Sequence, residues 1–131
     1  MSGVTKLPTS GMQGLIIKLI NIFSTETLRK YPTAGHTLRK VTKTYVIPET
    51  NITLNVGDTI IVSIYGLHND PKYYPDPENF DPERFSKEEI MKRHPYSYIP
   101  FGTGPRICIG KLSAYFNISS KFKLHYNTLY Y

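Results

Sequence analysis

The stretch PFGTGPRICIG, residues 100–110, contains the only cysteine of the 131-residue chain and places it among three glycines and an arginine. Gly102 and Gly104 permit positive φ angles in a tight turn, and Gly110 leaves out a side chain where a flat group could approach. A lone cysteine is more often a small buried hydrophobe. The glycines and the proline around Cys108 instead favour a loop built to present the sulfur.

A loop of this composition could bind a phosphate, present a nucleophilic thiolate or present a thiolate metal ligand. A phosphate-binding loop requires Lys followed by Ser or Thr after its last glycine, and Lys111 is followed by Leu112. A nucleophilic thiolate requires a histidine base. No histidine of the chain stands at a recognisable spacing from the cysteine: His36, His68, His94 and His125. A thiolate metal ligand fits the pattern best.

Composition divides the chain into three zones. Residues 1–25 carry two lysines and no acid, residues 26–110 carry eleven bases against ten acids, and residues 111–131 carry three lysines and no acid. Five of the six excess positive charges therefore lie in the flanks, which argues against a nucleic-acid-binding module. One cysteine excludes an intramolecular disulfide framework. The apolar run of residues 14–23 is too short for a spanning helix, and no signal peptide is visible.

Local patterns predict a mixture of helix and strand. A helix ends at Lys30, before Pro32, and its start is not predicted. Residues 37–67 favour a small antiparallel sheet in which NVGD, residues 55–58, forms a hairpin turn. Residues 69–85 combine prolines with aromatic residues and predict a packed, irregular meander. A short helix follows, capped by Ser86.

Two charged motifs lie outside the cysteine loop. Glu26 and Arg29 stand at i and i+3 on the predicted helix, and this spacing alone favours an exposed ion pair. Arg84 lies in PERF, residues 82–85, between a proline-fixed backbone and a phenylalanine. Its guanidinium could there bind a carboxylate with bidentate geometry. Each motif by itself indicates little.

The motifs ETLR, PERF and FGTGPRICIG, in this order, together resemble the C-terminal catalytic region of the cytochrome P450 superfamily of haem-thiolate monooxygenases. The resemblance covers residues 26–110. The residue sequences of the segments GLHNDPKYYPDPENFDPERF and YIPFGTGPRICIG most resemble those of microsomal, xenobiotic-metabolising members of insect type. The implied fold class is α+β, as a partial fragment of the mostly α-helical cytochrome P450 fold.

The resemblance implies roles for individual residues. Cys108 resembles the proximal thiolate and metal ligand of haem iron, and Phe101 the aromatic residue that shields the sulfur. Arg39 and Arg106 resemble the cations that pair with the haem propionates. Gly110 completes the cofactor-binding set. In addition, the buried charge triad of the family, which is structural rather than catalytic, corresponds to Glu26, Arg29 and Arg84.

The resemblance also implies an activity and its partners. The expected cofactor is haem b (iron protoporphyrin IX), with electrons from NADPH through a reductase and insertion of one oxygen atom of O2 into a small lipophilic substrate. Basic residues such as Lys92, Arg93 and Lys111 could meet an acidic reductase. The expected location is the cytosolic face of the endoplasmic reticulum membrane, through an anchor that this chain lacks. No nucleic-acid partner is expected.

The flanks depart from the family pattern. Residues 1–25 and 111–131 are unmatched, and their residue types together with a possible splice-donor sequence at Gly110-Lys111 suggest intron read-through. We therefore expect poor autonomous stability, weak or absent haem retention and no turnover by this fragment alone, because apolar surface would lack its partners. The alternative function is a non-catalytic haem or protein-interaction fragment from a degenerate or mis-annotated gene.

Overall fold

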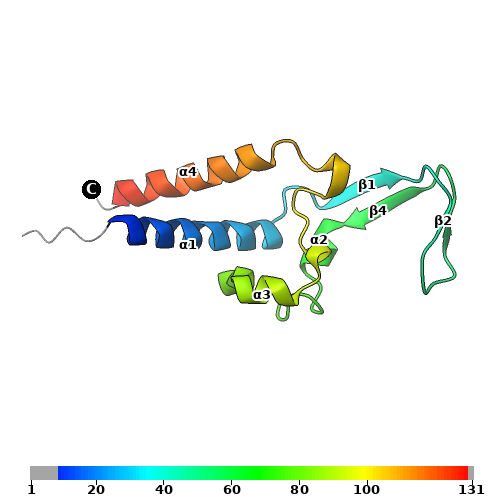
Figure 1. Cartoon of the computed structure of the whole chain (residues 1–131), viewed down its shortest axis with the longest axis horizontal. Coiled ribbons are helices and arrows are strands. Elements are labelled where there is room, and N and C mark those ends of the chain that lie inside the picture. Colours follow the sequence, from blue (N-terminus) through cyan, green and yellow to red (C-terminus); the bar gives the residue numbers. More distant parts are fainter. Residues whose placement is uncertain (1–8, 130–131) are drawn as a thin grey trace, which may run out of the picture.

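The protein, seen in a computed structural model that describes residues 9–129, is elongated (Figure 1). Two long helices, α1 (Thr9–Lys30) and α4 (Lys111–Leu129), lie side by side and antiparallel. The strands lie at the end of the molecule that is farthest from the start of α1 and the end of α4. The short helices α2 (Ile64–His68) and α3 (Lys87–Lys92) lie beside α1. The mixture of helices and small antiparallel sheets confirms the α+β class.

The four strands form two separate antiparallel pairs. Strand β1 (His36–Lys40) pairs with β4 (Thr59–Ser63), with Arg39 opposite Ile60. Between them in the chain, β2 (Tyr45–Val46) pairs with β3 (Thr53–Leu54). Along the chain, the short β2–β3 hairpin is therefore inserted between the two strands of the longer β1–β4 pair.

The prediction of a hairpin turn at residues 55–58 is wrong in one respect. The turn exists, since the Asp58 N–H donates to the Asn55 carbonyl (3.1 Å) and Gly57 has a φ of 98°. However, it joins β3 to β4, which belong to different pairs. The hairpin closes instead at residues 47–52, where the Ile47 N–H donates to the Ile52 carbonyl (3.0 Å).

The predicted helix boundaries are confirmed. Helix α1 ends at Lys30, two residues before Pro32, and it extends back without interruption to Thr9. Helix α3 begins after Ser86, whose hydroxyl accepts the Glu89 N–H (3.4 Å). A capping hydroxyl of this kind satisfies a backbone donor that the first turn leaves without an intrahelical partner.

The core of the described chain is small. It consists of Ile22 from α1, Tyr74 from the meander and Phe85 from the 3-10 turn η1 (Pro82–Phe85), with Tyr73 and Tyr98 packed against it. Tyr74 is fully buried, which confirms that residues 69–85 form an ordered, packed meander. The aromatic residues thus fix a segment that has no regular secondary structure of its own.

Many large apolar side chains of the described residues remain exposed. One group lies on the strands and their turns, and another lies on α1, on the cysteine loop and on α4: Leu15, Ile17, Leu19, Phe23, Ile107, Ile109, Leu112 and Phe116. Ile109 is the extreme case, at 101% of its reference exposure. None of the helices in residues 9–129 combines the length and the apolar character needed to cross a membrane.

Candidate functional site

The cysteine loop closes on itself through backbone hydrogen bonds. The Cys108 N–H donates to the Phe101 carbonyl (2.9 Å), and the Gly102 N–H donates to the Ile99 carbonyl (2.9 Å). Gly102 and Gly104 have φ angles of 71° and 74°, the left-handed region that glycine adopts without steric cost. The two predicted positive-φ positions are confirmed, and they leave the Cys108 side chain exposed.

A hollow of about 260 Å³ opens beside this loop. Arg39 reaches it from β1, while Phe101, Arg106 and Cys108 reach it from the loop and from the 3-10 turn η3 (Gly104–Arg106). Four of the five residues predicted to contact the cofactor therefore line one hollow, although 62 or more positions separate Arg39 from the other three. The sulfur and two guanidinium-bearing residues lie around the same space.

Gly110, the fifth predicted residue, lies beside the sulfur. A Cβ placed on Gly110 would meet only the Cys108 Sγ, at 3.7 Å, among the heavy atoms within 4 Å. The Lys111 N–H, which opens α4, donates to the Cys108 carbonyl (3.3 Å). On the other side of the loop, the rings of Phe101 and Tyr115 pack with centroids 5.3 Å apart. The loop is thus tied to α4 at both its backbone and its aromatic residue.

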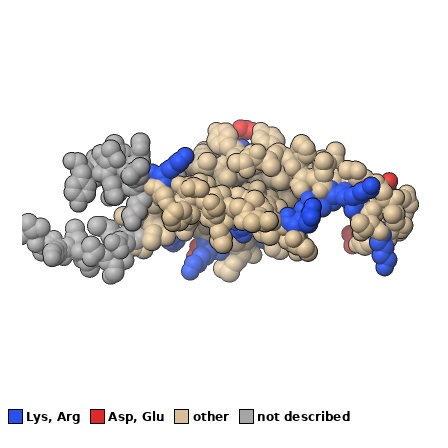
Figure 2. All heavy atoms as spheres, turned by 90° about the horizontal axis from the view of Figure 1, so that it is seen from above, with Lys and Arg blue, Asp and Glu red and all other residues tan. Residues whose placement is uncertain are grey.

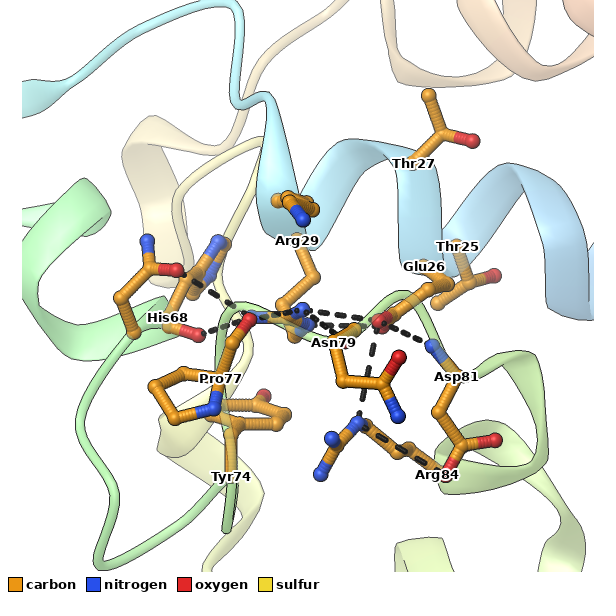
Figure 3. A network of polar contacts seen from close by, with 12 residues as sticks. Thr25, Glu26, Thr27, Arg29, His68, Tyr74, Pro77, Asn79, Asp81 and Arg84 are labelled. Atoms are coloured by element: carbon orange, nitrogen blue, oxygen red, sulfur yellow. Dashed lines mark hydrogen bonds and ion pairs between the residues drawn. The ribbon is translucent and has the colours of Figure 1, made fainter.

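The exposed Glu26–Arg29 ion pair that spacing alone favoured is wrong, and the buried pair that the resemblance implied is observed, because both side chains are 0% exposed. Arg29 donates from Nε to Glu26 Oε2 and from Nη2 to Glu26 Oε1, each at 2.8 Å. Figure 3 shows this bidentate pair at the centre of a polar network. The remaining Arg29 donors reach the carbonyl oxygens of His68 (3.0 Å) and Pro77 (2.8 Å). Spacing along one helix could not reveal that the meander covers the pair.

Arg84 joins the network differently from the prediction. Its Nε lies 3.9 Å from Glu26 Oε1 and 3.9 Å from Asp81 Oδ2, which is too long for a hydrogen bond. Its Nη atoms donate instead to the carbonyls of Pro75 (2.5 Å) and Asp76 (2.9 Å). The bidentate carboxylate partner belongs to Arg29, because Arg84 uses its guanidinium to hold the meander backbone.

His68, at the end of α2, has a structural role that no sequence pattern predicted. The side chain is fully buried, and Nε2 accepts the Ile99 N–H at 3.0 Å. Burial lowers the pKa of His68 from 6.5 to about 4, and the nearby Arg29 guanidinium acts in the same direction. The imidazole is therefore neutral near pH 7. A histidine followed by Asn-Asp-Pro was the visible signal, but its partner lies 31 positions away.

The basic residues suggested for contact with a reductase differ in whether their side chains already have partners within the chain. The Arg93 guanidinium lies over the rings of Tyr74 (4.7 Å) and Phe85 (4.8 Å), and burial lowers its pKa. Lys92 pairs with Glu89 at 2.5 Å. Lys111 is exposed and follows the cysteine loop directly. Figure 2 shows lysine and arginine side chains both near the end drawn in grey and towards the strand end, where acidic side chains also lie.

Comparisons with known proteins agree with these features. The chain is 57% identical over 86 residues to "Probable cytochrome P450 6a13" of Drosophila melanogaster, covering 66% of this chain and 17% of that protein. It is 59% identical over 85 residues to "Cytochrome P450 6B1" of Papilio polyxenes (65% and 17%) and 50% identical over 95 residues to "Cytochrome P450 9e2" of Blattella germanica (72% and 18%). The chain thus spans less than a fifth of the length of these relatives.

These three relatives come from insects, which confirms the predicted resemblance to insect-type members. The profile of the family described as "Cytochrome P450" matches residues 16–120, a span that contains the Glu26–Arg29 pair, the meander and the cysteine loop and reaches into both flanks. The protein belongs to the cytochrome P450 family.

Proposed function

We propose that residues 26–110 are the haem-binding region of a monooxygenase that inserts one oxygen atom of O2 into an organic substrate. One observation carries the proposal: Arg39, Phe101, Arg106 and Cys108 line a single hollow. An exposed sulfur, two cations and an aromatic ring are the groups needed to bind a metal porphyrin with two carboxylates. Family membership supports the same conclusion.

The residues present fit a haem group. Cys108 would hold the iron through its sulfur, and Gly110 leaves the space next to that sulfur free of a Cβ. Arg39 and Arg106 would bind the propionate carboxylates through charge-assisted hydrogen bonds. When bound, haem iron with a thiolate ligand supplies the site that binds and activates O2, with a strongly electron-donating ligand.

The chain's own groups then have defined tasks. The loop glycines set the backbone so that the Cys108 side chain is exposed. The hydrogen bond from the Cys108 N–H to the Phe101 carbonyl (2.9 Å) holds the backbone of Cys108 in place. Phe101, packed on Tyr115, would exclude water from one side of the sulfur. The Glu26–Arg29–Arg84 network would act structurally, by holding the meander against α1.

We further propose the partners and the location that the family implies. Electrons would come from NADPH through a reductase, the substrate would be small and lipophilic, and the complete protein would act at the cytosolic face of the endoplasmic reticulum membrane. Among the suggested contact cations, Lys111 has the best position for a reductase, since Arg93 is stacked on aromatic rings and Lys92 is paired.

A second candidate concerns this chain by itself, as a non-catalytic haem or interaction fragment. The exposed apolar side chains of α1, the loop and α4 favour it, since such surface normally packs against other elements. We also propose that residues 1–25 and 111–131 derive from intron read-through, although the family match of residues 16–120 extends into both of these flanks. Sequencing the transcript tests that origin: a message encoding KLSAYFN directly after CIG contradicts it.

A chimaera tests the proposed function. Residues 26–110 replace the matching segment of a complete insect relative, and the reduced, carbon-monoxide-treated protein is examined by absorption spectroscopy together with substrate oxygenation. We expect a thiolate-type Soret band and turnover, and the loss of both in the Cys108→Ser variant. An unchanged spectrum and unchanged turnover after Cys108→Ser would refute the assignment. Turnover by the 131-residue chain alone would refute the second candidate.

A further inference from the structure

The segment that leads into the cysteine loop has no strand partner among residues 9–129. Instead, hydrogen bonds to three other segments hold three consecutive residues, two of them through side chains of those segments and one through the side chain of Tyr98 itself. The Tyr74 hydroxyl donates to the Ser97 carbonyl (3.1 Å), the Tyr98 hydroxyl donates to the Thr25 carbonyl (3.0 Å), and His68 accepts the Ile99 N–H. Ile99 is the last of the three, two residues before Phe101.

Of the two contacts that fix the backbone of this segment, the one between His68 and Ile99 lies nearer to the loop. The distance from the Ile99 nitrogen to His68 Nε2 is 3.0 Å, and both residues are buried. An accepting Nε2 requires the neutral imidazole, with its proton on Nδ1. The rings of His68 and Tyr98 stack at 5.2 Å with an interplanar angle of 22°, so the imidazole plane is also fixed.

The backbone of His68 is held in turn by the buried ion pair. Arg29 donates from Nη1 to the His68 carbonyl (3.0 Å) and binds Glu26 through two further bonds. Figure 3 shows His68 and Glu26 on opposite sides of the Arg29 guanidinium. An uninterrupted series of buried polar contacts therefore runs from α1 through His68 to Ile99. The Ile99 carbonyl then accepts the Gly102 N–H inside the loop.

We propose that His68 is a positioning residue for the cysteine loop: its imidazole holds Ile99 so that Phe101 and Cys108 keep their places beside the hollow. The inference deepens the proposed function and rests on it where haem is concerned. His68 does not line the hollow, and its hydrogen bond reaches the loop through the backbone of Ile99. Its effect should therefore show first as a change in the order of the loop.

Amide hydrogen exchange in the 131-residue chain tests the proposal without haem. His68→Leu removes the acceptor, His68→Gln offers an amide oxygen in place of Nε2, and Val41→Ala is the control, a buried truncation near the end of β1. We expect His68→Leu to raise the exchange rates of Ile99, Gly102 and Cys108 at least tenfold over the control, and His68→Gln to stay within threefold of the parent. Equal rates in His68→Leu and the control would overturn the proposal.

A measurement on the unmodified chain covers the case in which His68→Leu does not fold. Nuclear magnetic resonance with nitrogen-15 should detect a coupling from the Ile99 N–H to His68 Nε2 across the hydrogen bond, with the imidazole proton on Nδ1. A proton on Nε2, or an Ile99 amide that exchanges at the rate of an unfolded chain, would overturn the proposal.

A haemin titration separates this proposal from the proposed function. We expect His68→Leu to weaken haemin binding about tenfold and His68→Gln to restore it. If Cys108→Ser binds haemin as the parent does while the exchange pattern is as expected, the proposed function fails and the positioning role stands. If Cys108→Ser abolishes the thiolate spectrum while His68→Leu changes neither exchange nor affinity, the positioning role alone fails.

Discussion

Glu26 is the buried carboxylate that accepts the most hydrogen bonds among the described residues, and replacing it by glutamine is the sharpest test of the network. Glu26 is 0% exposed and accepts two 2.8 Å bonds from Arg29 and one 3.0 Å bond from the Asp81 N–H. In Glu26→Gln the amide NH2 must face a guanidinium donor, and the buried Arg29 loses its counter-charge while keeping the same volume around it.

The structure supports a large loss of stability. Breaking a buried ion pair by removing one partner costs about 3 to 5 kcal/mol, because an uncompensated charge stays buried. The chain contains a matched control: Glu89 and Lys92 have the same i,i+3 spacing, but their side chains are 48% and 68% exposed. Glu89→Gln should leave the free energy of unfolding close to that of the parent chain, because water solvates both exposed partners. The two variants differ in burial rather than in chemistry.

Urea unfolding followed by far-ultraviolet circular dichroism measures both variants. Adding an osmolyte such as trimethylamine N-oxide to every sample raises the stability of the folded state so that a weakened variant still gives a folded baseline. The double substitution Glu26→Leu with Arg29→Met completes the series and should recover part of the loss, since it removes both buried charges together.

One result would refute this reasoning directly. If Glu26→Gln and Glu89→Gln lowered the free energy of unfolding by equal amounts, the Glu26–Arg29 pair would be solvated in solution, and the packing of the meander over it would be wrong. A double substitution as damaging as the single one would show that shape rather than charge decides the loss.

Three further predictions follow from other contacts. The pKa of His68 is about 4 in the folded chain and 6.5 in the unfolded chain, so the free energy of unfolding should fall as the pH drops from 6.5 towards 4, by about 2 kcal/mol at pH 5. His68→Gln should remove this part of the stability–pH profile. A variant profile identical to that of the parent would contradict this prediction. Gly102→Ala should lose about 1 to 2 kcal/mol at its φ of 71°, whereas Gly14→Ala, inside α1 with nothing within 4 Å of its Cβ, should gain up to about 1 kcal/mol in urea titrations. Ser86→Ala should cost about 1 kcal/mol through the lost α3 cap, and an unaltered urea midpoint would exclude that cap.

Sequence patterns predicted those parts of the fold that local chemistry decides. Pro32 cannot continue a helix and Ser86 caps one, so both boundaries follow from nearby residues. Gly102 and Gly104 likewise adopt the positive φ angles expected of them. The meander was predicted as packed because its aromatic residues need burial, and Tyr74 meets that need.

Features decided by distant segments could not be predicted in the same way. Burial of Glu26 depends on Asp81, 55 positions along the chain, and the His68 contact depends on Ile99. Strand pairing was also ambiguous, because β4 follows a good turn sequence yet pairs with β1 instead of with its neighbour β3. In each case a residue or strand contacts a partner that is distant in the sequence, and tertiary packing determines which partner that is.

The β1–β4 pair has a consequence for handling the isolated chain. Within residues 9–129, neither strand has a second neighbour, so each keeps an outer edge of free backbone N–H and C=O groups. Leu38 and Ile61, directly opposite each other, are 53% and 67% exposed. Such edges accept an additional strand from another molecule, and purified material should therefore self-associate with rising concentration through intermolecular β-pairing.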